Sequence, residues 1–168
     1  MFAAVRPVSL ISSIMPIVIA VVVAFVSFLP LGASDSVLTL GPQLVLCVVF
    51  HWAVRAPHLL PPVAVFVLGL AIDLFSAGPL GFWGLVYLSA YALIAWRRKT
   101  LRKRGFFMTW IGFAVVTAIV SAFAWALGSI YFSTLIAPGP LMISGGLTIA
   151  VYPPMSKLFS WVSGPARA

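Results

Sequence analysis

The ten Lys and Arg residues of this chain are unevenly spaced, and their spacing indicates a membrane protein. They leave three long stretches, 7–54, 56–96 and 105–156, without a basic side chain. Each stretch is long enough to cross a bilayer twice, because one spanning helix needs about 20 mostly apolar residues. Lys and Arg beside a span are retained in the cytoplasm during insertion. Six crossings with both termini in the cytoplasm would place every basic residue on that side: Arg6, Arg55, Arg97, Arg98, Lys99, Arg102, Lys103, Arg104, Lys157 and Arg167.

The amino-acid composition also indicates a membrane protein. Hydrophobic residues make up 63% of the chain and charged residues 7%, whereas a soluble domain carries about 25% charged residues. The formal net charge of +8 has a topological cause, because six of the ten basic residues form one octet at 97–104. We therefore expect an all-α integral membrane protein and no binding of nucleic acid.

Pro and Gly residues punctuate the apolar stretches and predict where helices end. The sequence predicts one domain over 1–168, a compact bundle of six transmembrane helices. The first apolar run exceeds the core of a signal peptide, about 7–15 residues, so it is expected to be an uncleaved first span. Pro153-Pro154 are expected to interrupt the last helix. The six spans are predicted near 10–31, 38–54, 61–76, 80–96, 106–132 and 141–162.

The chain has few residues that could carry catalysis. There is no Glu, and the two acids, Asp35 and Asp73, belong to different turns. A paired acid–base site is therefore not expected. A metal bound by Cys47 and His51 would need further ligands, and only His58 is available. We predict a protein that is not an enzyme and that carries no cofactor and no metal.

Polar residues recur on one face of the second span. Gln43, Cys47, His51 and Arg55 are spaced by four, so they share one side of a helix. The main interpretation is a face packed against neighbouring helices, with Gln43 and His51 hydrogen-bonded inside the bundle. A polar lining and a partner-facing surface are the alternatives.

Asp73 is the strongest single candidate for a functional residue, since it lies in the last turn of the third span. An ionisable residue near membrane depth is costly and is a candidate functional residue. Its carboxylate could instead accept backbone N–H groups from the Gly78-Pro79 turn or the start of the fourth span. Organisation of the turn and contact with a ligand or partner are both kept as hypotheses.

Two further features suggest contact surfaces. Ala114, Ala118, Ala122 and Ala126 recur at steps of four, and small residues in this pattern allow two helices to approach closely. The six basic residues of the octet, Arg97, Arg98, Lys99, Arg102, Lys103 and Arg104, are predicted to form a cytoplasmic loop, which is interpreted as an orientation signal that attracts anionic lipid headgroups. Docking of an acidic cytoplasmic protein is its alternative.

Several motifs stand close together in the middle of the chain. They are His51-Trp52, Arg55-Ala56-Pro57-His58, the run 66–74 with Gly69 and Asp73, Pro79-Leu80-Gly81, Tyr87 and Tyr91, and the Tyr152-Pro153 pair near the end adds to them. This combination resembles the rod shape-determining MreD family, and the similarity is sharpest over residues 50–98.

This resemblance implies a non-enzymatic scaffold in the bacterial cytoplasmic (inner) membrane, within the machinery of cell elongation and peptidoglycan synthesis. The implied partner is MreC, through its transmembrane helix, in a complex with RodA, a class B penicillin-binding protein and MreB. A homo-oligomer is left open. The family is also similar in fold to substrate-binding components of ECF-type vitamin transporters. Such a component is the alternative function, and Ala20-x-x-x-Ala24 resembles its coupling motif.

Overall fold

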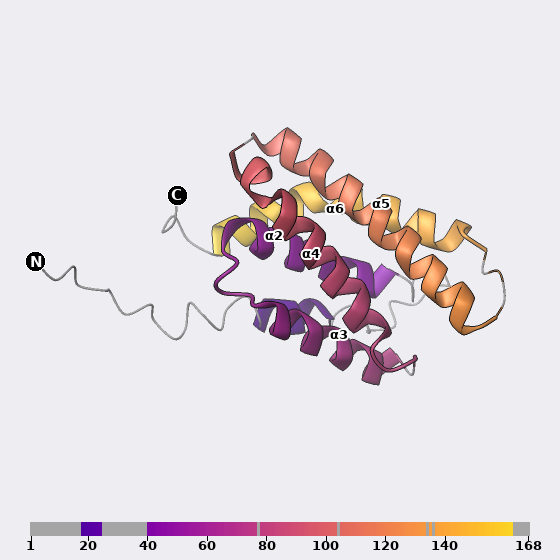
Figure 1. Ribbon diagram of the computed structural model, residues 1–168. Helices are drawn as coiled ribbons and strands as arrows, with labels where there is room; N and C mark the ends of the chain where they lie inside the picture. Colours follow the sequence, from indigo (N-terminus) through magenta and orange to yellow (C-terminus); the bar gives the residue numbers. More distant parts are fainter. Residues whose placement is uncertain are drawn as a thin grey trace, which may run out of the picture.

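The computed structural model describes residues 18–24, 40–76, 78–103, 105–133, 135 and 137–162. Residues 18–24, inside the first predicted span, are helical. No strand occurs in these ranges, so the predicted all-α class is confirmed for them. The longer helices are α2 (Leu40–Arg55), α3 (Pro62–Ser76), α4 (Phe82–Lys103), α5 (Phe106–Tyr131) and α6 (Gly139–Val162) (Figure 1).

Helix α2 is the central element of the bundle. All residues over 45–54 are buried, including His51 on the polar face of the helix, because neighbouring helices pack around α2. It packs against α4 and α6, while α4 also contacts α3 and α5, and α5 contacts α6. The rings of Phe113 and Tyr152 stack with centroids 4.1 Å apart, and Phe50 meets both edge-on. This aromatic cluster joins α2, α5 and α6.

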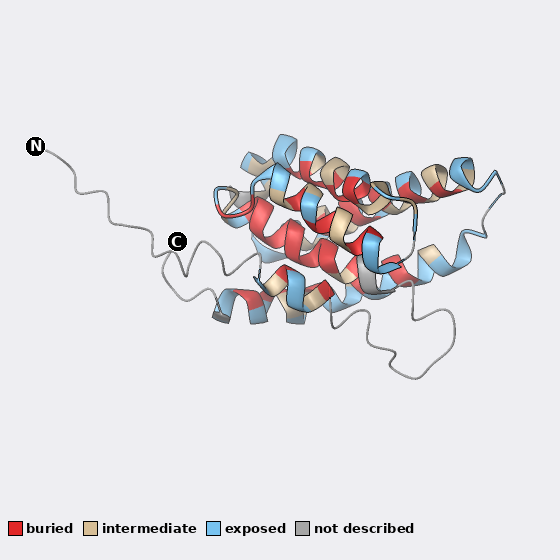
Figure 2. Ribbon diagram, turned by 90° about the horizontal axis from the view of Figure 1, so that it is seen from below, coloured by how far each residue is buried: buried red, intermediate tan, exposed pale blue. Residues whose placement is uncertain are grey.

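Large apolar side chains cover the outer faces of the bundle as well as its centre. Val67 on α3, Leu85 on α4, Ile119 on α5 and Leu147 on α6 are all exposed. Figure 2 shows the exposed residues on the outer faces and ends, around a buried middle. A soluble protein rarely exposes large apolar patches, so these faces fit contact with lipid.

Not all of the described helices are as long as a full membrane span. Among the described residues, only α5 is long and apolar enough to cross a membrane by length and composition. The apolar helices Gln43–Arg55 and Pro62–Ser76 are shorter. With 15 residues, α3 is about 22 Å long at 1.5 Å per residue, less than a hydrocarbon core of about 30 Å. The described residues therefore show a helical bundle, but not the six full-length spans that the sequence predicts.

Helix α4 is longer than predicted. Instead of stopping at Trp96, it continues to Lys103, so Arg97, Arg98 and Lys99 are on a helix rather than in a loop. Lys and Arg are good helix formers, and a cluster of charge does not itself end a helix. The first residue that favours a break is Gly105, which caps the start of α5.

Helix α6 passes through Pro153 and Pro154 without a break, contrary to the predicted interruption. Proline has no N–H to donate, so the carbonyl four residues earlier loses its partner. For Pro153 that carbonyl belongs to Ile149, and the indole Nε1–H of Trp110 on α5 donates to it at 3.0 Å. This hydrogen bond replaces the missing helical one and ties α6 to its neighbour.

The two ends of the bundle carry different residues. The α2–α3 connection and the C-terminal ends of α4 and α6 lie at one end, whereas the C-terminal ends of α3 and α5 lie at the other (Figure 1). Arg55, Arg97, Arg98, Lys99 and Lys157 belong to the first end. Asp73, in the last turn of α3, belongs to the second.

Candidate functional site

Asp73 joins the end of α3 to the start of α4. Its side chain is 1% exposed. The backbone N–H of Gly81 donates to Oδ2 at 2.8 Å, and that of Trp83 donates to Oδ1 at 3.0 Å. The first N–H groups of a helix have no partner within it, and the helix dipole favours negative charge there. The carboxylate therefore supplies the N-terminal cap of α4 from a different helix.

The Pro79-Leu80-Gly81 sequence forms the tight turn that brings these N–H groups to Asp73. Phe82 N–H donates to the Pro79 carbonyl at 3.1 Å, which closes a β-turn. Gly81 has φ of +91°, the sign that a type II turn requires at its third position and that other residues rarely adopt. A side chain at Gly81 would therefore strain the turn.

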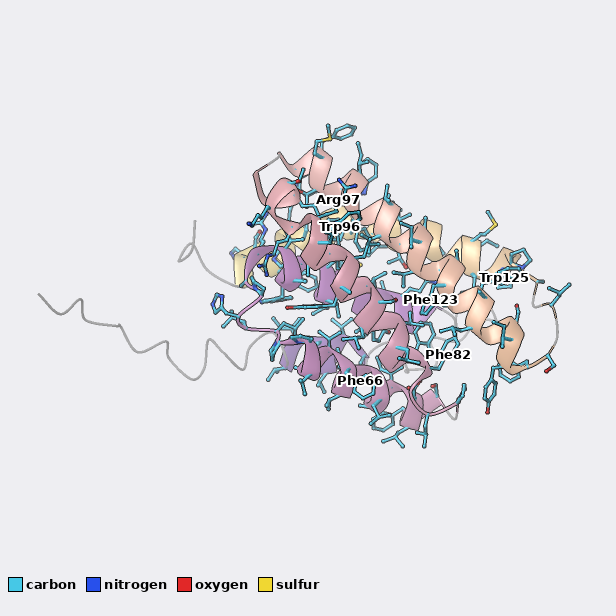
Figure 3. All side chains as sticks on the ribbon, in the orientation of Figure 1. Phe66, Phe82, Trp96, Arg97, Phe123 and Trp125 are labelled. Carbon is cyan, nitrogen blue, oxygen red and sulfur yellow. The ribbon has the colours of Figure 1, made fainter. Side chains whose placement is uncertain are left out.

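Gly69 sets the distance between α3 and α4. A Cβ atom added there would overlap the backbone of Gly84 and would lie 2.7 Å from the carbonyl carbon of Trp83. Phe66, one turn earlier on α3, covers Gly84 from the other side, with its Cε2 atom 3.0 Å from the position of a Cβ at Gly84. Figure 3 shows Phe66 and Phe82 on this pair of helices. The two backbones are thus in direct contact.

Helices α5 and α6 enclose a groove of about 520 Å³ on the outside of the bundle. Ala118 and Ala122 are exposed and line it, while Ala114 and Ala126 of the same stripe are half-buried and do not. Figure 3 places Trp125, another lining residue, on α5. The remaining lining residues are Thr117, Ser121, Pro138, Leu141, Met142, Gly145, Gly146 and Ile149.

Gln43 and His51 are both buried, yet their surroundings differ. The His51 ring contacts the ring of Phe159 on α6 at a centroid distance of 5.4 Å. Among the described residues, the Gln43 carbonyl oxygen finds no hydrogen-bond partner, in contrast to the hydrogen bond that the sequence predicts for it. Gln43 lies close to Gly145 of α6, because a Cβ there would be 3.6 Å from Gln43 Oε1.

The structure describes only some of the basic residues in the octet at 97–104. The guanidinium of Arg97 lies over the Trp96 ring, 4.5 Å from its centroid, and both side chains are at the C-terminal part of α4 (Figure 3). Arg98 is half-buried and Lys99 is exposed. The side chains of Arg102 and Lys103, and the whole of Arg104, lie outside the described residues.

Sequence reasoning missed three residues that shape these sites, namely Gly84, Thr117 and Gly145. Small or hydroxyl residues within apolar spans are their only signal, and many such residues occur in this chain. Which of them faces a neighbour depends on how the helices are rotated, and hydropathy does not report that rotation.

The fold and sites define an all-α membrane protein whose outer surface carries a groove walled by small residues. The comparison with protein families identifies it further. The sequence model described as rod shape-determining protein MreD matches residues 8–162, nearly the whole chain. The chain belongs to the MreD family, and this membership gives it a role in determining rod shape. No curated protein and no solved structure matches it.

The vitamin-transporter alternative gains no support from these comparisons, and the proposed likeness in fold has no solved structure behind it. Ala20 and Ala24 are both buried. A coupling motif would have to be exposed to reach a second protein, so this pair is better explained as packing within the bundle.

Proposed function

We propose that this protein is a non-enzymatic scaffold of the cell-elongation complex in the bacterial cytoplasmic membrane, and that the groove between α5 and α6 docks the transmembrane helix of MreC. The exposure of Ala118 and Ala122 in that groove carries the proposal. Family membership supports the role in shape, and the groove supports the docking.

The groove has the properties that a helix needs for docking in lipid. Apolar burial gives no net drive there, because lipid tails are as apolar as the side chains. Association depends instead on close backbone approach past small residues. On one wall Ala118 and Ala122 have short side chains, and on the other Gly145 and Gly146 have none.

RodA, a class B penicillin-binding protein and MreB complete the proposed complex. The basic end of the bundle would face the cytoplasm, where Arg97, Arg98 and Lys99 meet anionic headgroups or an acidic surface of a partner. Each Lys or Arg near such a membrane contributes about 1 kcal/mol of attraction.

The docking is tested by replacing Ala118 and Ala122 with Leu in a rod-shaped bacterium that depends on this protein. The added bulk should fill the groove, abolish copurification with MreC and produce rounded cells. Ala92→Leu is the matched control, because Ala92 is exposed on α4 outside the groove. It should retain binding and shape.

Protein abundance in the membrane separates the outcomes. Rounded cells with normal amounts of the double variant, and with the control unaffected, support docking in the groove. Full copurification of MreC with the double variant would exclude the groove as its site. Unchanged shape after complete depletion of the protein would refute the scaffold function as a whole.

A further inference from the structure

A hydrogen bond joins α5 to α6 at the basic end of the groove. The indole Nε1–H of Trp110 on α5 donates to the Ile149 carbonyl on α6 at 3.0 Å. Ile149 is the lining residue of α6 nearest that end, whereas Trp110 does not itself line the groove. At the opposite end, the chain connects the two helices directly through residues 132–138. The two walls of the groove are therefore tied together at both ends. We call the bond between Trp110 and Ile149 the Trp110 latch.

The Ile149 carbonyl is available to Trp110 because of Pro153. In a regular helix the N–H four residues later would bond to this carbonyl, and proline has no N–H. The buried hydroxyls of Ser144 and Thr148 on α6 behave differently, since both donate to carbonyls of α6 itself. Their hydrogen bonds stay within one helix. At Pro153, by contrast, a lost helical hydrogen bond is exchanged for one between two helices.

Docking in the groove depends on the distance between its walls. Ala118 on α5 and Gly146 on α6 let a docked backbone touch both walls only while the walls keep their spacing. Dispersion attraction falls steeply with distance, and about 0.5–1 Å of extra separation loses a quarter to a half of it. Pro153 and Pro154 also weaken the α6 wall, because each removes one helical hydrogen bond. A tie at this point of α6 therefore matters for the shape of the groove.

We propose that Trp110 is a positioning residue for docking, whose latch holds α5 and α6 at the spacing that the docked transmembrane helix requires. The inference rests on the proposed docking function and adds a residue that acts through the groove wall without touching the partner. A latch can favour docking by no more than its own free energy. For a hydrogen bond between membrane helices, that limit corresponds to roughly 3- to 20-fold in affinity.

Trp110→Phe tests the latch, because it keeps an aromatic ring and removes the donor. The affinity of the purified full-length protein for MreC is measured in nanodiscs. The variant should bind MreC roughly 3- to 20-fold more weakly than the native protein. Because Trp110 does not line the groove, the loss would come from the position of the walls rather than from a lost contact with the partner.

Spin labels measure the spacing of the walls without any partner. In a Cys47→Ser background, labels replace the exposed residues Val115 on α5 and Val151 on α6, toward the basic end. Their distance distribution should become longer and broader in Trp110→Phe. The matched control pair is Phe123 and Ile143, which are exposed toward the outer end. Their distance should stay unchanged, because the chain itself connects the helices there.

Pro153→Ala separates positioning of the walls from simple satisfaction of the carbonyl. Alanine gives Ile149 a helical donor, so Trp110→Phe should lower the thermal unfolding midpoint less in this background than in the native one. The tie between the helices is still missing, so the loss of affinity should remain. Pro154→Ala is the matched control, because it makes the same change one residue later and gives its N–H to Ala150 instead. The Pro153→Ala background also keeps the measurement possible if Trp110→Phe alone unfolds.

The outcomes separate this inference from the docking proposal. Unchanged affinity or an unchanged 115–151 distance in Trp110→Phe, with affinity lost in Ala118→Leu/Ala122→Leu, would refute the latch and leave docking intact. Affinity that returns to the native value in Trp110→Phe/Pro153→Ala would show that Trp110 only satisfies the carbonyl, and would overturn its positioning role. Retained affinity in the Ala118→Leu/Ala122→Leu variant would instead refute docking in the groove itself.

Discussion

Asp73 is the residue at which two helices and a turn depend on one side chain. Its two oxygens accept from two separate backbone N–H groups, Gly81 and Trp83. The turn between the helices works only if Gly81 keeps its positive φ. The carboxylate of Asp73 and the positive φ of Gly81 are therefore both needed for the turn between α3 and α4. We propose that the role of Asp73 is to organise this turn.

Substitutions at Asp73 test that role. Asp73→Leu should lower the free energy of unfolding by about 1–3 kcal/mol for each buried N–H left without a partner. Asp73→Asn should lose less, since its carbonyl oxygen still accepts one hydrogen bond while its amide nitrogen cannot accept the other. Thermal unfolding in detergent, read alongside cell shape, checks both. Normal stability with lost shape in Asp73→Asn would instead indicate an ionic contact with a partner.

At the scale of elements, the closest approach is between α3 and α4. Their backbones touch at Gly69 and Gly84, where neither helix has a side chain to separate them. In lipid, such close contact is a main source of helix association. The hydrogen bonds of Asp73 fix the register at one end of the pair, and the two glycines fix the spacing in the middle.

Gly69→Ala should therefore separate the pair. The new methyl group would meet backbone atoms of α4 that cannot rotate away, and overpacking of this kind costs about 1–3 kcal/mol of unfolding free energy. Gly146→Ala is the control, because a Cβ at Gly146 meets no atom of the described residues within 4 Å and alanine favours a helix by about 1 kcal/mol over glycine. A thermal unfolding midpoint that falls equally in both variants would argue against the close contact.

Sequence alone locates these helices better than it orients them. Pro61-Pro62 and Gly105 mark the starts of α3 and α5 because they break helices, whereas the basic octet was taken for a loop although nothing in it breaks α4. Pro153 was taken for an interruption because the compensating donor, Trp110, lies on another helix. The facing pairs could not be predicted, because inner and outer faces are equally apolar in lipid.

At the scale of the whole molecule, charge and helix length together suggest how the bundle sits in a membrane. The described basic residues gather at one end (Figure 1), and cytoplasmic segments carry the excess of Lys and Arg. Short helices such as α3 can be accommodated by local thinning of the bilayer at modest cost. We therefore propose that the basic end is cytoplasmic and that the end carrying Asp73 faces outward.

Cysteine labelling of intact cells tests this orientation. In a Cys47→Ser background, which removes the single native thiol, a cysteine at Leu135 should react with an impermeant maleimide added outside. Leu135 is 87% exposed and follows α5 at the outward end. A cysteine at Thr100, exposed among the basic residues of α4, should react only after the membrane is permeabilised. Permeabilised cells also provide the control that both thiols are reactive.

Labelling of position 100 in intact cells, as strong as that of position 135, would place the basic end outside. It would contradict the retention of positive charge in the cytoplasm on which the topology depends.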